Sequence, residues 1–308
     1  MPPAATRTEP PRTTPSPRAA ASQNAAGNEH IWIEPTERSA LAAAGLDTVA
    51  QVMATDAGRC LRALRDRENW RLELLDSAGQ ARGAFLKKHH VRGLGNWLRA
   101  KLGLPLPATA GRTEAENNDR LQRAGIPAMR TIAFGERLLE GGLLESFVLT
   151  EELTGFTQLD HFLRKRFAEL NTTKPVSNPD NANQVAALAR LSLRVAAIAG
   201  RFHRAGFNHR DLYCCHFFIR EDAAGDFEVR MIDLQRVQHR TRLRRRWIVK
   251  DLAQLHYSAP REWVSCSRQM AFFKQYLGVE RLRPQDKRLL RSVLRKRWFM
   301  ERKLGPCP

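Results

Sequence analysis

Two short segments in the second half of the chain carry the residue types that phosphoryl transfer requires. Residues 208–217 contain the tetrapeptide His-Arg-Asp-Leu, whose aspartate is Asp211, and residues 231–234 read Met-Ile-Asp-Leu, whose aspartate is Asp233. In transfer from ATP, one aspartate accepts the proton of the attacking hydroxyl group, and another holds the Mg²⁺ that bridges the phosphates. The sequence therefore predicts Asp211 as the catalytic base and Asp233 as a metal ligand. The alternative is a turn or cap residue at Asp211 and a strand-end residue at Asp233.

The residues around the two aspartates narrow the class of kinase. His-Arg-Asp-Leu is the first half of the protein-kinase catalytic loop, whose second half is an Asn five residues after the Asp; here that position is His216. Together with Tyr213, Phe217 and the Ile-Asp-Leu at residues 232–234, this pattern resembles the lipopolysaccharide core heptose kinases and the related Kdo kinases of Gram-negative bacteria, which have His at this position. The resemblance covers roughly residues 59–257.

The resemblance implies an α+β protein with a two-lobed protein-kinase-like fold, in which a small antiparallel-sheet lobe precedes a larger, mainly helical lobe. We expect the small lobe over residues 30–150 and the large lobe over residues 151–308. Residues 1–29 are rich in Pro, Ala and Thr and are expected to be a disordered tail.

The cofactors implied by the resemblance are ATP and Mg²⁺. Asp233 and His216 are the expected metal ligands, and Arg210 is assigned with Asp211 to the catalytic loop. Because Mg²⁺ prefers oxygen ligands, a histidine buried in the core is the alternative interpretation of His216.

Lys87 is the expected phosphate-binding lysine. It follows an aromatic-aliphatic pair, as in the kinase strand Val-Ala-Ile-Lys, whose lysine also pairs with a glutamate on the next helix. That helix is predicted over residues 112–124 with Thr113 as its cap; the partner is Glu114, with Glu116 as the fallback. The alternative interpretation of Lys87 is an exposed lysine on an edge strand.

The segment after the last small-lobe strand resembles the hinge between kinase lobes, where adenine bonds to backbone groups. Glu151 and Leu153 are the residues expected there. In the large lobe, apolar residues recur at helical intervals and predict a buried helix directly before the catalytic loop. They are Leu188, Leu191, Val195, Ile198 and Phe202.

The first strands of the small lobe are expected as a three-stranded meander over residues 48–55, 70–74 and 84–87. A kinase carries a glycine-rich loop between the first two of these strands, and here only Gly58 lies there. The basic residues that follow it can approach phosphates instead. They are Arg62, Arg65 and Arg67.

The charge of the chain indicates an anionic partner. Lys and Arg number 51 against 32 Asp and Glu, which gives a formal net charge of +19. The densest basic cluster spans residues 236–250, where a kinase holds its acceptor substrate, and arginine suits carboxylates and phosphates. An anionic glycolipid or a membrane surface fits this cluster; a solvated basic face is the alternative, and nucleic acid is disfavoured because no known recognition motif accompanies it. Residues 91–106 form a basic amphipathic segment that either touches a membrane or packs on the small lobe.

These observations predict an ATP-dependent kinase, a phosphotransferase that phosphorylates a heptose or Kdo hydroxyl group of the lipopolysaccharide inner core. The alternatives are a kinase of proteins or other small molecules, or a pseudokinase scaffold. The sequence has no run of about 18 uncharged apolar residues and no apolar signal-type core. We therefore expect a cytoplasmic protein that contacts the cytoplasmic face of the inner membrane peripherally.

Overall fold

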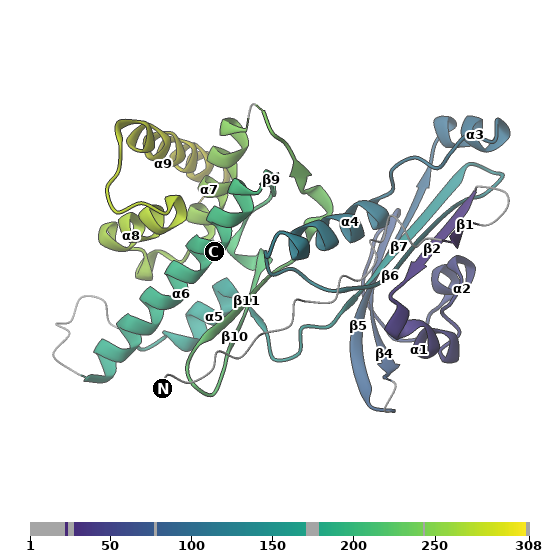
Figure 1. Ribbon diagram of the computed structural model, residues 1–308, viewed down its shortest axis with the longest axis horizontal. Helices are drawn as coiled ribbons and strands as arrows, with labels where there is room; N and C mark the ends of the chain where they lie inside the picture. The colour runs from purple at the N-terminus through teal and green to yellow at the C-terminus, as the bar shows by residue number, and fades with distance from the viewer. Residues whose placement is uncertain (1–21, 24–27, 77–78, 171–178, 243, 306–308) are drawn as a thin grey trace, which may run out of the picture.

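The computed structural model describes residues 22–23, 28–76, 79–170, 179–242 and 244–305, which form a sheet-containing lobe and a mainly helical lobe (Figure 1). The described part of the small lobe contains a seven-stranded sheet of order β1-β2-β6-β7-β5-β4-β3, in which neighbouring strands are antiparallel. Its strands are β1 (Ser22–Gln23), β2 (Glu29–Ile33), β3 (Arg59–Ala63), β4 (Arg67–Leu75), β5 (Ala81–Arg92), β6 (Thr131–Leu138) and β7 (Leu143–Glu151). Glu151 ends the sheet, and the next strand pairs within the large lobe.

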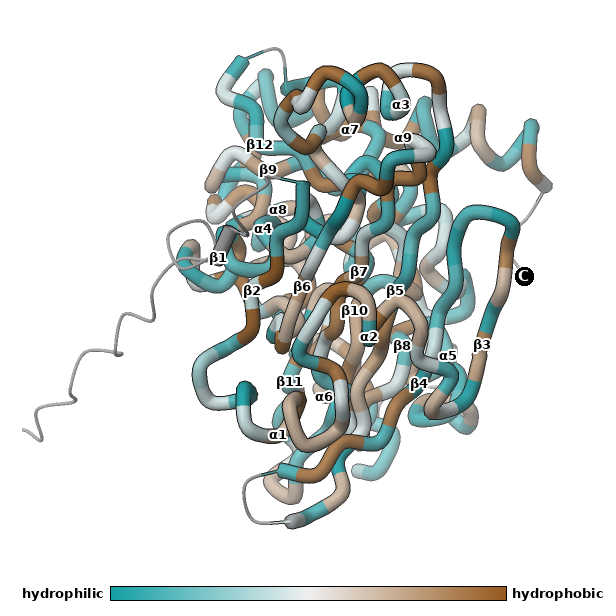
Figure 2. Tube along the Cα trace, turned by 90° about the vertical axis from the view of Figure 1, so that its right-hand side faces the viewer, coloured by the Kyte–Doolittle hydropathy of each residue, from teal (hydrophilic) through white to brown (hydrophobic). Residues whose placement is uncertain are grey.

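Helices cover both faces of this sheet. They are α1 (Arg38–Ala43), α2 (Val49–Ala54), α3 (Leu94–Lys101) and α4 (Ala110–Arg123). The helices α1 and α2 lie on the face that points away from the large lobe, and Figure 2 looks onto them. There Leu41 and Val49 pack in one apolar cluster with Phe147 of β7. The opposite face carries α4, whose Ala115 packs with Phe134 and Val148, so α4 lies between the sheet and the large lobe (Figure 1).

The large lobe is built around one long helix. Its helices are α5 (Leu159–Arg166), α6 (Pro179–Arg204), α7 (Arg245–Ser258), α8 (Cys266–Leu277) and α9 (Pro284–Leu304), and its short strands are β8 (Thr157–Gln158), β9 (Phe207–Asn208), β10 (Phe217–Glu221), β11 (Phe227–Met231) and β12 (Gln238–His239). The five apolar residues that predicted a buried helix all lie buried in α6. The hairpin of β10 and β11 separates the two aspartate segments.

The predicted first strand over residues 48–55 is wrong, because this segment is helix α2. The Thr48 hydroxyl accepts a hydrogen bond from Gln51 N–H, and the Gln51 side chain accepts one from Thr48 N–H. This reciprocal pair is a capping box, which fixes the start of a helix. The first strand of the meander is instead β3, so the turn that replaces the glycine-rich loop covers residues 64–66 and contains no glycine.

Gly58 therefore has a different purpose from the one expected. It precedes β3 with φ +128°, and a Cβ atom there would lie 2.4 Å from the carbonyl oxygen of Arg71 on β4. Glycine permits this close approach of two backbones.

Two boundaries also differ from the sequence-based expectation. The cap of α4 is Thr109, which accepts from Arg112 N–H at 3.2 Å, whereas the Thr113 hydroxyl donates to the Thr109 carbonyl oxygen. Within the predicted tail, residues 1–21 and 24–27 lie outside the described residues. Of the other tail residues, Ser22 and Gln23 form β1, which pairs with β2, and β2 begins at Glu29.

Gly111 sets the distance between α4 and the sheet. A Cβ atom at this position would lie 2.4 Å from the carbonyl oxygen of Phe147. We expect Gly111→Ala to push α4 off the sheet and to destabilise the protein by about 1–3 kcal/mol, because backbone atoms cannot move aside as a side chain can. Thermal unfolding measures the change.

Gly95→Ala is the matched control, since Gly95 lies in α3 and a Cβ atom added there would meet no neighbouring atom within 4 Å. This change is expected to be neutral or stabilising by up to about 1 kcal/mol. Equal melting temperatures for the Gly111→Ala variant and the unchanged protein would contradict the expected packing effect.

Candidate active site

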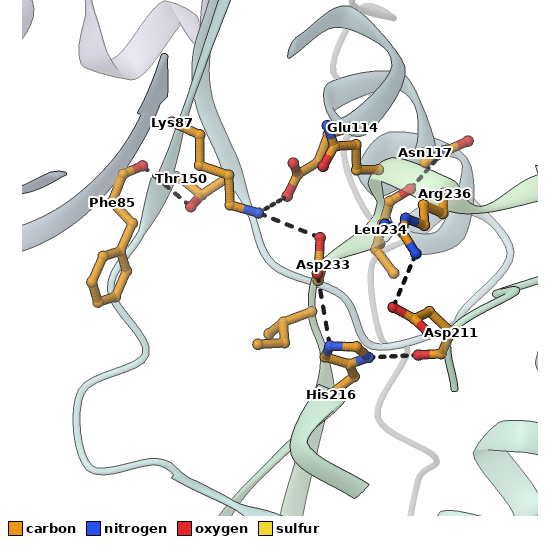
Figure 3. A network of polar contacts seen from close by, with 12 residues as sticks. Phe85, Lys87, Glu114, Asn117, Thr150, Asp211, His216, Asp233, Leu234 and Arg236 are labelled. Atoms are coloured by element: carbon orange, nitrogen blue, oxygen red, sulfur yellow. Dashed lines mark hydrogen bonds and ion pairs between the residues drawn. The ribbon is translucent and has the colours of Figure 1, made fainter. Parts of the chain in front are cut away.

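Lys87 and Glu114 form the predicted ion pair. Lys87 lies in β5, and its Nζ is 2.6 Å from Oε1 of Glu114, a buried residue of α4 (Figure 3). The same Nζ is 3.8 Å from Oδ1 of Asp233. Burial alone would lower the pKa of Lys87, but attraction to Glu114 and then Asp233 raises it above its usual value. Lys87 is therefore a fixed positive charge in the cleft. Lys88 points to the other face and donates to the Met53 carbonyl oxygen.

Asp233 is held in an uncommon backbone conformation next to this lysine. Its φ and ψ are 55° and 57°, in the left-handed region that residues other than glycine rarely adopt. The Asn117 side chain on α4 stabilises the following turn by donating to the carbonyl oxygens of Leu234 and Val237, at 2.8 Å and 3.1 Å. Strain supported by surrounding contacts is frequent at functional sites.

The Asp233 carboxylate is ionised and accessible. Burial alone would raise its pKa, but the charge of Lys87, followed by that of His216 when its ring is protonated, lowers the pKa below its usual value. The side chain remains 42% exposed. These properties suit a carboxylate that receives a cation.

The catalytic-loop segment is fixed by Asp251, a fully buried residue of α7. Its two carboxylate oxygens accept hydrogen bonds from the backbone N–H groups of His209 and Arg210, at 2.7 Å and 2.8 Å. Arg210 has φ 69°, and its guanidinium group lies 4.9 Å from the centre of the Trp247 ring. It is thus packed beside the loop rather than exposed in the cleft.

The Asp211 carboxylate lies between two polar side chains. Its Oδ2 lies 3.5 Å from a guanidinium nitrogen of Arg236, and its Oδ1 accepts from Nε2 of Gln254 at 3.4 Å. Gln254 is a site residue that the motifs do not identify, because it belongs to α7, far along the chain. These contacts orient the carboxylate without neutralising it in a buried ion pair.

His216 joins the two aspartate segments (Figure 3). Its Nδ1 is 2.6 Å from the backbone oxygen of Asp211, and its Nε2 is 3.7 Å from Oδ2 of Asp233. A carbonyl oxygen only accepts hydrogen bonds, so Nδ1 carries a proton. In the neutral ring, the lone pair of Nε2 then faces Asp233, where a cation can use it. His216 therefore lies between the two aspartate segments, where the expected metal ligand is required.

His209 stacks behind His216, with ring centres 5.3 Å apart. Burial, followed by the charge of His216, lowers the pKa of His209 to about 4. His209 is therefore neutral at physiological pH and adds no competing positive charge behind the proposed cation site.

The donor set fits a magnesium ion that is held mainly by ATP. Within the described ranges there is no cluster of three or more His, Cys, Asp or Glu residues placed to enclose a metal. Mg²⁺ at kinase sites takes only one or two protein ligands, and phosphate oxygens and water complete its shell. The ionised, half-exposed Asp233 meets that need, with His216 as its neighbour.

The hinge segment offers backbone groups rather than side chains. The Glu151 carboxylate accepts from Arg130 N–H at 3.0 Å, and Glu152 N–H donates to the Gly83 carbonyl oxygen. The Leu153 carbonyl oxygen accepts from Phe156 N–H, whereas the Leu153 N–H has no acceptor among the residues that the structure describes. Leu153 therefore has a free donor at the position where adenine is expected.

Arg67 is the arginine that the structure brings to the side of Lys87, the expected phosphate-binding residue. In the pairing of β4 with β5, Arg67 lies opposite His89, and Asn69 lies opposite Lys87. Directly paired residues share a face of the sheet, so Arg67 and Lys87 project toward α4 and Asp233. The positive charge of Arg67 also acts to lower the pKa values of Lys87, His89 and Asp233. The sequence offers three arginines for this place and only the strand register selects among them.

Arg67→Ala is expected to raise the KM for ATP by roughly 10- to 100-fold, the range for losing a charge-assisted hydrogen bond of about 1.5–3 kcal/mol. Steady-state kinetics with varied MgATP measures this. The control is Arg62→Ala, on an exposed position of β3, which is expected to change KM less than threefold, about the effect of an exposed charge. An unchanged KM in the Arg67 variant would remove this residue from the phosphate site.

The family profile described as the lipopolysaccharide kinase (Kdo/WaaP) family matches residues 53–276. The chain belongs to this family. The lipopolysaccharide core heptose(I) kinase WaaP of Pseudomonas aeruginosa is 34% identical over 241 residues, which cover 77% of this chain and 80% of the relative. The enzyme of the same name from Escherichia coli is 31% identical over 238 residues, covering 76% and 83%.

A solved structure supports the same assignment. A chain from the structure titled "WaaP in complex with acyl carrier protein" matches with a TM-score of 0.61 and 31% identity, over 89% of this chain and 97% of that one. The predicted family, the two-lobed α+β fold and the enzyme class, a phosphotransferase, are confirmed for this member of the Kdo/WaaP family. The matched region is somewhat longer than the predicted residues 59–257.

Proposed function

We propose that the protein is an ATP-dependent kinase that phosphorylates a heptose hydroxyl group of the lipopolysaccharide inner core. The observation that supports it best is the continuous polar path from Glu114 through Lys87, Asp233 and His216 to Asp211. The names of the relatives favour heptose over Kdo as the acceptor.

Each residue of this path has one proposed role. Lys87 binds ATP phosphates and is positioned by Glu114, while the Leu153 N–H binds the adenine ring. Asp233 and His216 hold Mg²⁺, which neutralises charge on the phosphates when it is bound. Asp211 accepts the proton of the sugar hydroxyl group, and Arg210 keeps the loop in place by packing on Trp247.

The acceptor side of the cleft is cationic. Arg236 is 69% exposed beside Asp211, and Arg240 and Arg246 lie over the Trp247 ring at 5.7 Å and 4.6 Å. Other members of the basic cluster are used inside the lobe: Arg244 donates to the carbonyl oxygen of Phe207, and Lys250 donates to that of Arg210. The arginines that remain accessible suit the anionic groups of a glycolipid acceptor.

A carrier protein is a second proposed partner, because the solved relative is titled as a complex with acyl carrier protein. The large lobe contains an apolar cavity of about 150 Å³ between α5, α6, α7, α8 and α9. Its lining includes Leu159, Leu191, Leu255, Trp263, Phe272 and Leu290. A fatty acyl chain is the part of such a carrier that this lining fits. Binding of acylated but not of unacylated carrier protein tests the proposal.

The proposed acceptor is anchored in a membrane, so the reaction takes place at the cytoplasmic face of the inner membrane. Of the helices that the structure describes, none has both the length and the apolar character needed to cross a bilayer. The proposed location is therefore peripheral.

The decisive experiment measures phosphate transfer from labelled ATP to purified core lipopolysaccharide that contains heptose, to core that ends in Kdo, and to a generic protein substrate. We expect incorporation only with heptose-containing core, and mass spectrometry of core from cells lacking the gene should show one lost phosphate. Transfer to Kdo alone or to protein would replace the proposed acceptor, and no transfer to any substrate would favour the pseudokinase alternative.

A further inference from the structure

Helix α3 at the end of the small lobe is apolar but unburied. None of its eight residues is buried, and Leu94 is 81% exposed while Trp97 is 39% exposed. The chain that follows exposes Leu102 and Leu104 as well. An isolated helix of this length is marginal in water, and a contiguous exposed apolar patch usually marks an interaction site.

The apolar residues of α3 are accompanied only by positive charge. Residues 91–106 contain no Asp or Glu, and their cations are Arg92, Arg99 and Lys101. The Lys101 ammonium group lies 4.4 Å from the centre of the Trp97 ring. Helices that lie in the headgroup region of a bilayer typically combine leucine and tryptophan with lysine and arginine in this way.

The helix is held firmly against the sheet. The turn between β6 and β7 packs on its backbone so closely that a Cβ atom at Gly142 would lie 2.7 Å from Cα of Trp97. The Asn96 side chain donates to the Val91 carbonyl oxygen, which ties α3 to the end of β5. The exposed side chains therefore have a defined orientation, and the turn adds Leu139 as a further exposed apolar residue.

The position of α3 matches the acceptor side of the large lobe. In Figure 1 it lies in the upper part of the molecule, as do α7 and α9, and in Figure 2 these three helices and β12 are again uppermost. Three accessible arginines of that side flank these elements: Arg236 beside Asp211 just before β12, Arg240 just after β12, and Arg246 in α7. One flat surface can thus contact α3 and face the acceptor-side cations.

We propose that residues 91–106 dock on an anionic lipid bilayer, with Leu94, Trp97 and Leu98 among the headgroups and the three cations on lipid phosphates. This proposal rests on the proposed function, because a lipid-anchored acceptor is the reason for the enzyme to bind a membrane. It adds the surface that makes the contact. A second copy of the chain is a poor occupant, because it presents the same cations and a net charge of +19.

The test is cosedimentation of the full chain with vesicles rich in phosphatidylglycerol and with neutral phosphatidylcholine vesicles. We expect binding to the anionic vesicles, and a loss of about tenfold or more for the combined variant Leu94→Ser, Trp97→Ser and Leu98→Ser, because inserted apolar area supplies much of the affinity. The matched control is Leu75→Ser, which changes a leucine of β4 that is 61% exposed. All variants alter exposed or half-exposed side chains, and an unchanged melting temperature verifies that they fold.

The proposal is overturned by any of these results: no binding of the unchanged protein to anionic vesicles, undiminished binding of the α3 variant, or loss of binding only after Trp298→Ser and Phe299→Ser, which would move the contact to α9. Dimerisation abolished by the α3 variant would identify a second copy as the occupant instead. Activity on lipid-free core oligosaccharide separates the two hypotheses. We expect the α3 variant to retain it, whereas its absence in the unchanged protein would count against the proposed function alone.

Discussion

Asp211→Asn is expected to lower kcat for phosphate transfer by about 10²- to 10⁴-fold while the affinity for MgATP changes little. The amide has the shape of the carboxylate and can still accept from Arg236, but it cannot take the proton of the acceptor hydroxyl group. Because the proposed nucleotide contacts, Lys87 and Asp233, lie on the other side of His216, nucleotide binding is not expected to depend on this proton acceptor. Single-turnover kinetics and a separate titration with MgATP distinguish the two effects.

The control for this variant is Asp222→Asn in the turn between β10 and β11. The Asp222 carboxylate accepts from the N–H groups of Ala224 and Asp226, which an Asn oxygen can also do, so activity should be unchanged. If the Asp211 variant retained full kcat, Asp211 would not be the base, and the assignment of the catalytic loop would fail with it.

Asp233→Asn is expected to abolish the advantage of MgATP over metal-free ATP and to lower kcat by about 10³-fold, since a bound metal supplies several kcal/mol of charge stabilisation. The change removes the only ionised carboxylate that faces His216 Nε2 among the described residues, and it also leaves Lys87 with Glu114 as its remaining anionic partner. Calorimetric titration with ATP, with and without Mg²⁺, measures the loss.

Chelation provides the comparison for the Asp233 variant. The unchanged protein treated with EDTA should bind ATP as weakly as the variant does, and added Mg²⁺ should restore only the unchanged protein. A variant that still binds MgATP more tightly than ATP would place the metal on other ligands.

The contacts made by α4 show which features local sequence patterns can predict and which they cannot. The Lys87–Glu114 pair was predictable because a lysine strand followed by a glutamate helix is a pattern along the chain. The contacts of Asn117 with the turn after Asp233 were not predictable, since they join residues more than a hundred positions apart. Asp is one of the residue types that adopt the left-handed conformation more often than others, but the residue type alone did not mark Asp233 for it.

The error at residues 48–55 has a local cause. Valines and threonines in this segment fit a strand as well as a helix, and the signals that favour the helix are the four-residue capping box and the helical spacing of Val49, Val52 and Met53. Packing of Val49 and Val52 on the sheet then stabilises the helix. A first strand at residues 48–55 would place the phosphate loop at Gly58. In the structure the corresponding turn lies between β3 and β4, at residues 64–66, and contains no glycine.

By itself, the sequence determined the family, the order of the two lobes and which residues are proposed as the base, the metal ligand and the phosphate lysine. These are set by short motifs whose chemistry depends on residue type and near spacing. Tertiary structure alone decided that Arg67 faces the cleft, that Arg244 and Lys250 are used internally and that α3 remains exposed. An amphipathic or basic segment has the same pattern whether a neighbouring element covers it or not, so only the packing of distant parts of the chain distinguishes the two cases.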